Sequence, residues 1–356
     1  MNVNKKFFDL IDLGRKDIWR YARLLGKQGK TNLIDPQQKD FTPIEKVGNW
    51  LVKREDKSAV GSHKFRALAY QLDYLLDHKI KAAVLSSSGN AAIAASRILS
   101  KNANLKLFVF LSRKTPPGKL AALRFSKNLI PILSERPLRM AKYLSKRFGL
   151  RDLRPSQDQN AITGFRSLGF EIFEQKPDIE NIFSFATSFA SVRGIAEAFE
   201  FLVKIGARQK MPKIFAVTSS GRLAGELSGQ VAKSAEAYEA KAEQRVDTSR
   251  QNNFVEWTGV DSDPAARRMG RQTASAGNYL VSISAEELAL TRKIYPDLKT
   301  SQEGWMSLAA AEKVQPRGES LVVLTGRDWP SAKVDFSKFE TADKFTEADK
   351  MVARHA

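Results

Sequence analysis

The sequence predicts an α/β protein that contains mainly parallel sheet and divides into two lobes. From Asn49 onward, short apolar runs alternate with amphipathic stretches, which is the pattern of strand–helix units. The chain has 356 residues, whereas single hydrophobic cores stop growing near about 250–300 residues, so a second lobe is expected. Its 42% apolar and 27% charged residues are ordinary usage for a folded protein.

Individual elements follow from the spacing of the apolar residues. Residues 50–52 form a predicted strand, and apolar residues between 65 and 76 recur on one face of the helix that follows. Residues 82–85 form the next strand, and a helix of small residues is expected from 91 to 99. Further strands are predicted at residues 105–111, 129–133, 182–186, 214–217 and 321–324.

Two segments break this alternation. Residues 228–253 are rich in Ala, Glu, Lys and Gln, which predicts a surface helix and a connecting loop. Asp261 and Asp263 precede Pro264 and are interpreted as a polar turn rather than a cation site. The polar, charged tail after Trp329 is expected to be peripheral.

The composition excludes several classes of active site. Cysteine is absent, which excludes disulfides, thiol nucleophiles and iron–sulfur clusters. The three histidines, His63, His78 and His355, are too few and too scattered for a histidine metal site, so no metal is expected. The sequence has neither an apolar signal core nor an 18-residue apolar run, which predicts a cytoplasmic protein without a membrane segment.

The chain is strongly basic, with 58 basic and 39 acidic residues and a net charge of +19. Such a balance favours an anionic partner, or it serves solubility alone. Basic residues are spread along the chain, and the richer segments at 142–154 and 267–271 lack interleaved aromatic residues. We therefore interpret most of this charge as solvated surface and do not expect nucleic acid as a partner.

Lys64 lies in a turn between a predicted strand and a predicted helix. In the run Gly61-Ser62-His63-Lys64, Ser62 is placed to cap the helix and Lys64 lies in its first turn. The positive end of a helix lowers the pKa of a nearby ammonium, which makes the nucleophilic amine more accessible for Schiff-base chemistry. On this tetrapeptide alone, an ordinary surface lysine is the simpler interpretation.

Three further turns follow predicted strands. Residues 86–90, Ser-Ser-Ser-Gly-Asn, offer backbone amides and hydroxyls that suit a carboxylate or phosphate. An ordinary serine-rich helix cap is the alternative interpretation of this turn. Residues 187–191 present three hydroxyls in a similar turn. Thr325-Gly326 ends the last strand, at the sheet edge where open α/β folds bind ligands.

In this order, the four turns resemble the fold-type II family of pyridoxal-phosphate enzymes, which includes threonine synthase, threonine dehydratase, cysteine synthase and the tryptophan synthase β chain. The resemblance covers residues 19–325. Residues 51–67 are similar to the cofactor-lysine segment of the family. Residues 164–172 are similar to the helix before its phosphate loop, and residues 304–311 to the small-residue helix before its terminal Thr-Gly.

The family has two lobes, each a mainly parallel sheet flanked by helices, and is commonly homodimeric. By position, the resemblance implies a larger cofactor-binding lobe from residues 1–80 and 160–335. Residues 81–159 would form a smaller lobe that carries the substrate-carboxylate loop. Residues 336–356 would be a peripheral tail.

The resemblance also implies a role for each turn around pyridoxal 5'-phosphate. Lys64 would form the Schiff base and transfer the proton, and Thr325 would hydrogen-bond the pyridine nitrogen. The substrate carboxylate would be held by Ser87, Ser88, Gly89 and Asn90, with Asn90 also near the ring oxygen. The phosphate would be cradled by Thr187, Ser188, Phe189, Ala190 and Ser191.

The chain departs from the family at several of these positions. The phosphate loop of the family is glycine-rich, whereas Thr187 and Ala190 stand at the expected glycines. A Cβ at a position that needs positive φ costs about 1 kcal/mol or more, which predicts a rearranged loop and weaker cofactor binding. Phe189 is similar to threonine synthases, whereas His63 is similar to the tryptophan synthase β chain.

Three functions remain open on the sequence. The first is a lyase or transferase that eliminates or replaces a β or γ substituent of a small anionic amino acid, with chemistry similar to that of threonine synthase. The second is a threonine or serine dehydratase, or a cysteine synthase-like enzyme. The third is a catalytically weak family member that uses its basic surface to bind an anionic partner.

Overall fold

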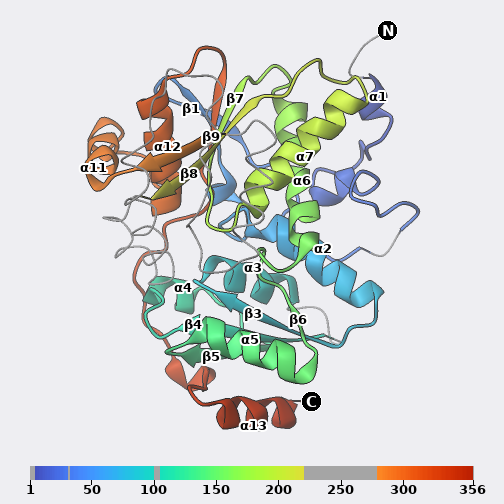
Figure 1. Cartoon of the computed structure of the whole chain (residues 1–356), viewed down its shortest axis with the longest axis vertical. Helices are drawn as coiled ribbons and strands as arrows, with labels where there is room; N and C mark the ends of the chain where they lie inside the picture. Colours follow the sequence, from blue (N-terminus) through green and yellow to red (C-terminus); the bar gives the residue numbers. More distant parts are fainter. Residues whose placement is uncertain (1–4, 31–32, 100–104, 220–278, 356) are drawn as a thin grey trace.

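A computed structural model describes residues 5–30, 33–99, 105–219 and 279–355 of the chain. Figure 1 shows two lobes stacked along the long axis, each with a sheet flanked by helices. The described strands form a six-stranded sheet in the larger lobe and a five-stranded sheet in the smaller one. The α/β class and the two lobes are therefore confirmed.

The larger sheet has the strand order β1-β2-β10-β7-β8-β9. β1 pairs antiparallel with β2 through a tight turn at Gly48, whose φ of +56° favours glycine, and the other pairs are parallel. The strands are β1 (Ile44–Val47), β2 (Trp50–Lys53), β7 (Asn181–Phe185), β8 (Lys213–Ser219), β9 (Tyr279–Ile283) and β10 (Ser320–Val323).

Helices cover both faces of the larger sheet, so successive strand residues enter different cores. Ile182 packs into the core shared with α2, α6 and α7, whereas Phe183 packs into a second core under α12. This explains why these strands are continuous apolar runs. The helices are α2 (Lys64–Asp77), α6 (Gln159–Gln175), α7 (Ala190–Lys204), α11 (Ala285–Ile294) and α12 (Gln302–Val314).

Close backbone contacts between helices fix the position of α2. A Cβ on Gly164 of α6 would lie 2.5 Å from the carbonyl oxygen of Arg66 in α2. A Cβ on Gly194 of α7 would lie 2.6 Å from the Cβ of Phe165 in α6. Real Cβ atoms do not approach this closely, so the glycines allow α6 to pack tightly between α2 and α7.

The smaller sheet has the order β11-β5-β4-β3-β6 and is parallel throughout. Ile93 of α3 packs on one face, whereas Met140 of α5 and Met351 of α13 pack on the other. The elements are β3 (Ala82–Ser87), α3 (Asn90–Leu99), β4 (Lys106–Ser112), α4 (Pro117–Ala121), β5 (Leu129–Ser134), α5 (Pro137–Phe148), β6 (Arg151–Asp152), β11 (Glu340–Thr341) and α13 (Phe345–His355).

The last described segment completes the smaller lobe instead of lying apart from it. The chain crosses from the end of β10 in the larger lobe to the smaller lobe along one side of the molecule (Figure 1). β11 then pairs with β5, and α13 buries Ala348, Met351 and Val352. The apolar spacing of these three residues was present in the sequence, but the surrounding charges obscured it. Three short elements, α1 (Lys5–Phe8), η1 (Ile18–Tyr21) and η3 (Phe336–Lys338), lie near the chain ends, and η2 (Glu55–Lys57) precedes α2.

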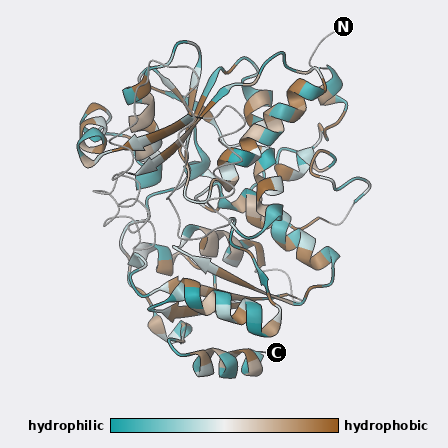
Figure 2. Ribbon diagram, in the orientation of Figure 1, coloured by the Kyte–Doolittle hydropathy of each residue, from teal (hydrophilic) through white to brown (hydrophobic). Residues whose placement is uncertain are grey.

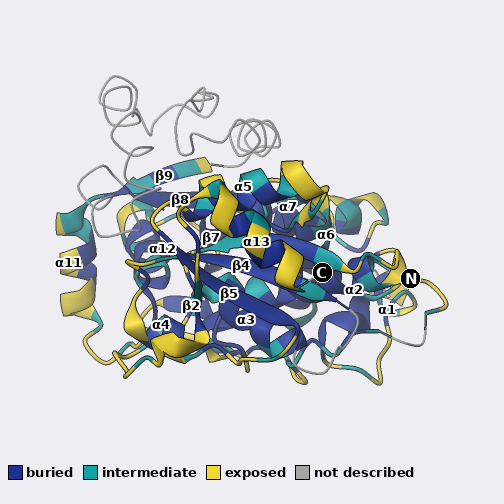
Figure 3. Cartoon of the chain, turned by 90° about the horizontal axis from the view of Figure 1, so that it is seen from below, coloured by how far each residue is buried: buried dark blue, intermediate teal, exposed yellow. Residues whose placement is uncertain are grey.

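Every strand that the sequence predicts is present within a residue or two, and β1, β6, β9 and β11 are additional. Figure 2 shows the central strands as mainly hydrophobic, and Figure 3 shows them as buried, with α11 and α13 exposing one face. Residues 228–253, with Asp261 and Asp263, lie outside the described residues. Within the described ranges, no helix is long and apolar enough to cross a membrane.

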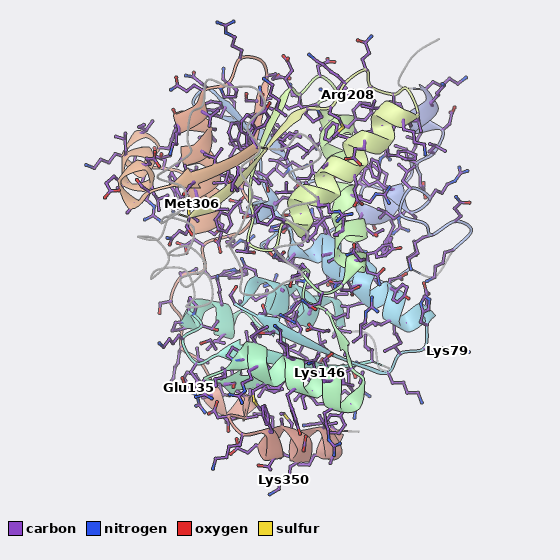
Figure 4. All side chains as sticks on the ribbon, viewed as in Figure 1. Lys79, Glu135, Lys146, Arg208, Met306 and Lys350 are labelled. Carbon is purple, nitrogen blue, oxygen red and sulfur yellow. The ribbon has the colours of Figure 1, made fainter. Side chains whose placement is uncertain are left out.

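Exposed basic side chains are distributed over both lobes. Lys79 ends the turn after α2, Lys146 lies on α5 and Lys350 lies on α13, and all three are exposed. In Figure 4 these three residues lie at well-separated places on the molecule. For the described residues, the charge is therefore spread as the sequence suggested.

Candidate active site

The turn before Lys64 is pinned to the end of β10. Ser62 forms a β-bridge with Gly326, and the backbone amide of His63 donates to the carbonyl oxygen of Thr325 at 3.0 Å. Gly61 has a φ of +78°, which turns the chain from η2 into the helix. α2 then begins at Lys64 itself. Lys64 is thereby placed at the carboxyl edge of the parallel strands.

The ring of His63 adds a second link to the same carbonyl. Its Nδ1 donates to the Thr325 oxygen at 2.7 Å, and its ring lies 5.1 Å from that of Phe165. Burial and the neighbouring Lys64 hold the pKa of His63 well below its ordinary value, so the ring is neutral. Its Nε2 is then a buried acceptor, and it has no hydrogen-bond partner among the described residues.

Lys64 has an unusual environment for a lysine. Its ammonium lies 5.6 Å from the centre of the Phe165 ring. Burial lowers its pKa to about 8, while Glu303 of α12 acts in the opposite direction. Burial is thus the cause of the lowered pKa in the structure, whereas the sequence had suggested the helix end. At pH 7 roughly a tenth of such an amine is unprotonated, against less than about 0.1% for an ordinary lysine.

A closed ionic cluster, which the sequence analysis missed, lies beneath the start of α2. Arg66 pairs with Glu55 at 2.8 Å and with Glu171 of α6 at 2.9 Å, and Lys53 pairs with Glu171 at 2.5 Å. All four side chains are almost completely buried, and the two cations balance the two anions. These cations hold the pKa of Glu171 at about 2 although burial acts against them. In the sequence, the signal for this cluster was that the charged residues Lys53 and Arg66 stand within apolar segments.

The loop between β3 and α3 meets the Lys64 turn through Asn90. The amide nitrogen of Asn90 would lie 3.0 Å from a Cβ placed on Gly326. Asn90 Oδ1 is buried and lacks a hydrogen-bond partner among the described residues. Ser88 is exposed, and Gly89 has a φ of +125° that disfavours any side chain. The backbone amides of Gly89 and Ala92 donate to Ser87 Oγ at 3.0 and 3.2 Å, so Ser87 caps the helix.

The loop between β7 and α7 differs from the expectation at its strained position. Phe189 adopts the left-handed conformation with a φ of +58° and is 3% exposed, whereas Thr187 and Ala190 have no positive φ. Thr187 and Ala190 are therefore unstrained, because the turn reverses at Phe189 and Ala190 is already helical. Phe189 is the N-cap residue of α7, and its side chain accepts no hydrogen bond from the helix. The first backbone amides of α7 are therefore not capped by the side chain of this residue. Ser188 is half-buried and Ser191 is buried.

Thr325 and Gly326 are the point on which the other turns converge. Thr325 is buried, and its carbonyl oxygen accepts both bonds from His63. The carbonyl oxygen of Gly326 accepts from the Ser301 amide at 2.8 Å and from Thr300 Oγ1 at 3.1 Å. This edge therefore links α2, β10 and the start of α12.

The structure brings Asn90, from the loop after β3 of the smaller sheet, to the edge of the larger sheet at which Lys64 and Thr325 lie. Lys64, Asn90 and Thr325 are joined through the contacts just described, and the loop 187–191 is connected to them through α6 and Phe165. The sequence analysis did not predict that Glu303 acts on Lys64 or that Ser62 pairs with Gly326. Within the described residues, no group of His, Asp and Glu is arranged to hold a metal ion.

Comparison with known proteins identifies related sequences and folds. The family model described as "Pyridoxal-phosphate dependent enzyme" matches residues 25–326. A curated relative, "Threonine dehydratase 2 biosynthetic, chloroplastic" from Solanum lycopersicum, is 26% identical over 156 residues, which are 43% of this chain and only 26% of that protein.

Solved structures share the fold at low sequence identity. Threonine synthase from Escherichia coli has a TM-score of 0.67 and 12% identity, covering 95% of this chain and 88% of its own. Maize serine racemase has a TM-score of 0.60 and 16% identity, covering 88% of this chain and 93% of its own. At these identities the structural likeness shows the fold and leaves the reaction open.

Proposed function

The chain belongs to the family of pyridoxal-phosphate-dependent enzymes, and we propose that it eliminates or replaces a β or γ substituent of an amino acid. Threonine synthase-like chemistry is the first candidate. The observation that carries this proposal is Lys64, a lysine with a lowered pKa at the start of α2. It lies at the same sheet edge as Thr325 and Asn90.

The residues at this edge fit pyridoxal phosphate. Ser62 Oγ, His63 Nε2 and Asn90 Oδ1 are buried without hydrogen-bond partners among the described residues. A buried polar atom left unpaired costs about 1–3 kcal/mol, so a polar ligand at this edge would recover part of that energy. The first amides of α7, which the side chain of Phe189 does not cap, suit a phosphate group, and Phe189 supplies the turn before them.

Each residue then has a task that its chemistry allows. Lys64 would hold the cofactor and, as a free amine, take the proton from the substrate α-carbon. Thr325 would offer a neutral hydroxyl to the pyridine nitrogen. When bound, pyridoxal phosphate supplies the electron withdrawal that makes the α-proton acidic. The loop 87–90 would orient the substrate carboxylate, and the basic surface would attract a phosphorylated substrate.

Absorbance of the purified protein with added pyridoxal phosphate tests the cofactor site. Wild type should show a band near the visible edge that borohydride removes while fixing the pyridoxyl group to the protein. Lys64→Ala should lose this band, and Lys146→Ala, which removes an exposed lysine on α5, should keep it. A wild-type protein without the band at saturating cofactor would favour the anion-binding alternative instead.

A threonine or serine dehydratase is the second candidate, favoured by the local match to the tomato threonine dehydratase. The two candidates differ in their products. A threonine synthase-like enzyme releases phosphate and threonine from O-phosphohomoserine, whereas a dehydratase releases ammonia and a 2-keto acid from threonine or serine. Incubating the holoprotein with each amino acid and assaying phosphate and keto acid therefore separates them.

A further inference from the structure

The side chain of Lys119, in α4, crosses the substrate loop. A Cβ placed on Gly89 would lie 2.5 Å from the Cδ of Lys119, 3.0 Å from its Cβ and 3.2 Å from its Cγ. The aliphatic stem of Lys119 therefore lies directly on the face of Gly89 that has no side chain. Two bonds beyond Cδ, the ammonium can lie no more than about 3 Å further along. A cation thus stands beside the 87–90 loop, where the sequence analysis had placed only neutral groups.

We propose that the Lys119 ammonium binds the carboxylate of the amino-acid substrate held at the 87–90 loop. This inference rests on the proposed function and adds a charged residue to its substrate site. It assigns the recognition of the carboxylate to both sides of the loop, with Asn90 on the α3 side and Lys119 on the α4 side.

The hydrogen bonds of the loop explain why a cation is needed. Ser87 Oγ accepts from the amides of Gly89 and Ala92, so these two donors are engaged within the loop itself. An incoming carboxylate would find fewer free amides than the sequence of the turn suggests. A hydrogen bond from a charged donor is worth more than one from a neutral donor. Lys119 supplies that donor at the right place.

The charge of Lys119 is available to a ligand. No hydrogen bond or ion pair joins its side chain to another residue in the described part of the chain. The residue is half-buried, so water competes less strongly with a ligand for its ammonium. Arg97 of α3, by contrast, donates to the carbonyl oxygen of Ala59.

The position of α4 is fixed by the segment that crosses between the lobes. A Cβ on Gly118 would lie 2.6 Å from the carbonyl oxygen of Trp329, so α4 packs directly on this segment. The guanidinium groups of Arg97 and Arg327 lie 5.7 and 5.4 Å from the centre of the Trp329 ring. The same indole would lie 2.6 Å from a Cβ on Gly61, close to Lys64. These contacts connect α4, and with it Lys119, to the turn before Lys64.

Titration of the holoprotein with L-serine tests the inference through the absorbance of the bound cofactor. Lys119→Met keeps the stem but removes the charge, and should weaken apparent L-serine binding by about 10- to 100-fold, the range of one hydrogen bond to a charged group. Lys119→Arg should retain most of the affinity. Lys114→Met, which removes an exposed lysine from the same connection, should bind L-serine as wild type does.

A second ligand identifies the group that Lys119 binds. Ethanolamine has the amine and hydroxyl of serine without its carboxylate, so wild type and Lys119→Met should respond to it equally. Equal L-serine affinity in wild type and Lys119→Met would overturn the inference and leave the proposed function standing. Loss of cofactor binding in Lys119→Met would overturn it too, because the role would then lie with the cofactor. If L-serine, L-threonine and O-phospho-L-homoserine all leave the wild-type spectrum unchanged, the proposed function itself fails, and the inference with it.

Discussion

Lys53 and Lys64 are eleven residues apart, and both lie near the start of α2, yet they have opposite environments. Lys53 is fully buried and bonded to Glu171, Gln175 and the carbonyl oxygen of Thr42, at 2.5–2.6 Å. The ammonium of Lys64 faces the Phe165 ring and makes no hydrogen bond or ion pair to a described residue. Burial lowers the pKa of both lysines. The comparison teaches that pairing, more than burial, separates a structural lysine from a reactive one.

The largest expected effect concerns the cluster that contains Lys53. Glu171→Gln leaves two buried cations, Lys53 and Arg66, facing the single charge of Glu55, so the free energy of unfolding should fall by about 3–5 kcal/mol. Urea denaturation of the apoprotein measures this loss. Glu197→Gln removes a partly exposed partner of Arg193 and should cost less than about 1 kcal/mol. Equal losses in the two variants would show that the cluster is not a special source of stability.

The next effect concerns the reactivity of Lys64 in the apoprotein. With a pKa of about 8, its neutral fraction rises tenfold per pH unit below pH 8 and levels off above it. The rate of pyridoxal phosphate binding should follow the same curve. A free lysine peptide, whose amine has a pKa of about 10.4, should instead gain acetylation rate up to about pH 10 in a parallel reaction. A binding rate that continues to climb to pH 10 would contradict the lowered pKa.

The smallest effect concerns the bond that holds the Lys64 turn to β10. His63→Phe keeps an aromatic ring against Phe165 but removes the Nδ1 donor to the Thr325 carbonyl. Because the backbone amide of His63 still bonds that carbonyl, we expect a loss of about 1 kcal/mol in unfolding free energy. The pH midpoint of cofactor binding should shift little. A large stability loss would mean that the ring, more than the amide, anchors the turn.

The features that the sequence predicted depend on local patterns. The strands are apolar because both faces of the larger sheet are covered, and such runs are visible in a few residues. Lys64, Asn90 and Thr325 each follow or end such a run. β2 and β10 are parallel neighbours, so the proximity of Thr325 to the turn before Lys64 could be inferred from the order of the elements. Asn90 follows β3 in the other sheet, so its proximity depends on how the two lobes pack.

The features that the sequence missed depend on contacts between distant segments. The cluster of Lys53, Glu55, Arg66 and Glu171 joins residues more than a hundred positions apart. Lys119 contacts Gly89, and the neighbouring Gly118 packs on the crossing segment at Trp329, about 200 positions further along the chain. The sequence also did not show that Phe189 adopts the left-handed conformation, because the family pattern marks where glycines stand and only the backbone shows which residue reverses direction. No local spacing encodes these relations.

The most direct test of the central claim is to find where the cofactor attaches. The holoprotein, reduced with borohydride and digested, is mapped by mass spectrometry for the pyridoxyl group. A single modified site at Lys64, with Lys53 unmodified, is the predicted result, because Lys53 is paired with Glu171 whereas the amine of Lys64 faces the Phe165 ring and has a lowered pKa. A pyridoxyl group on Lys53 or spread over exposed lysines, with Lys64 unmodified, would contradict it.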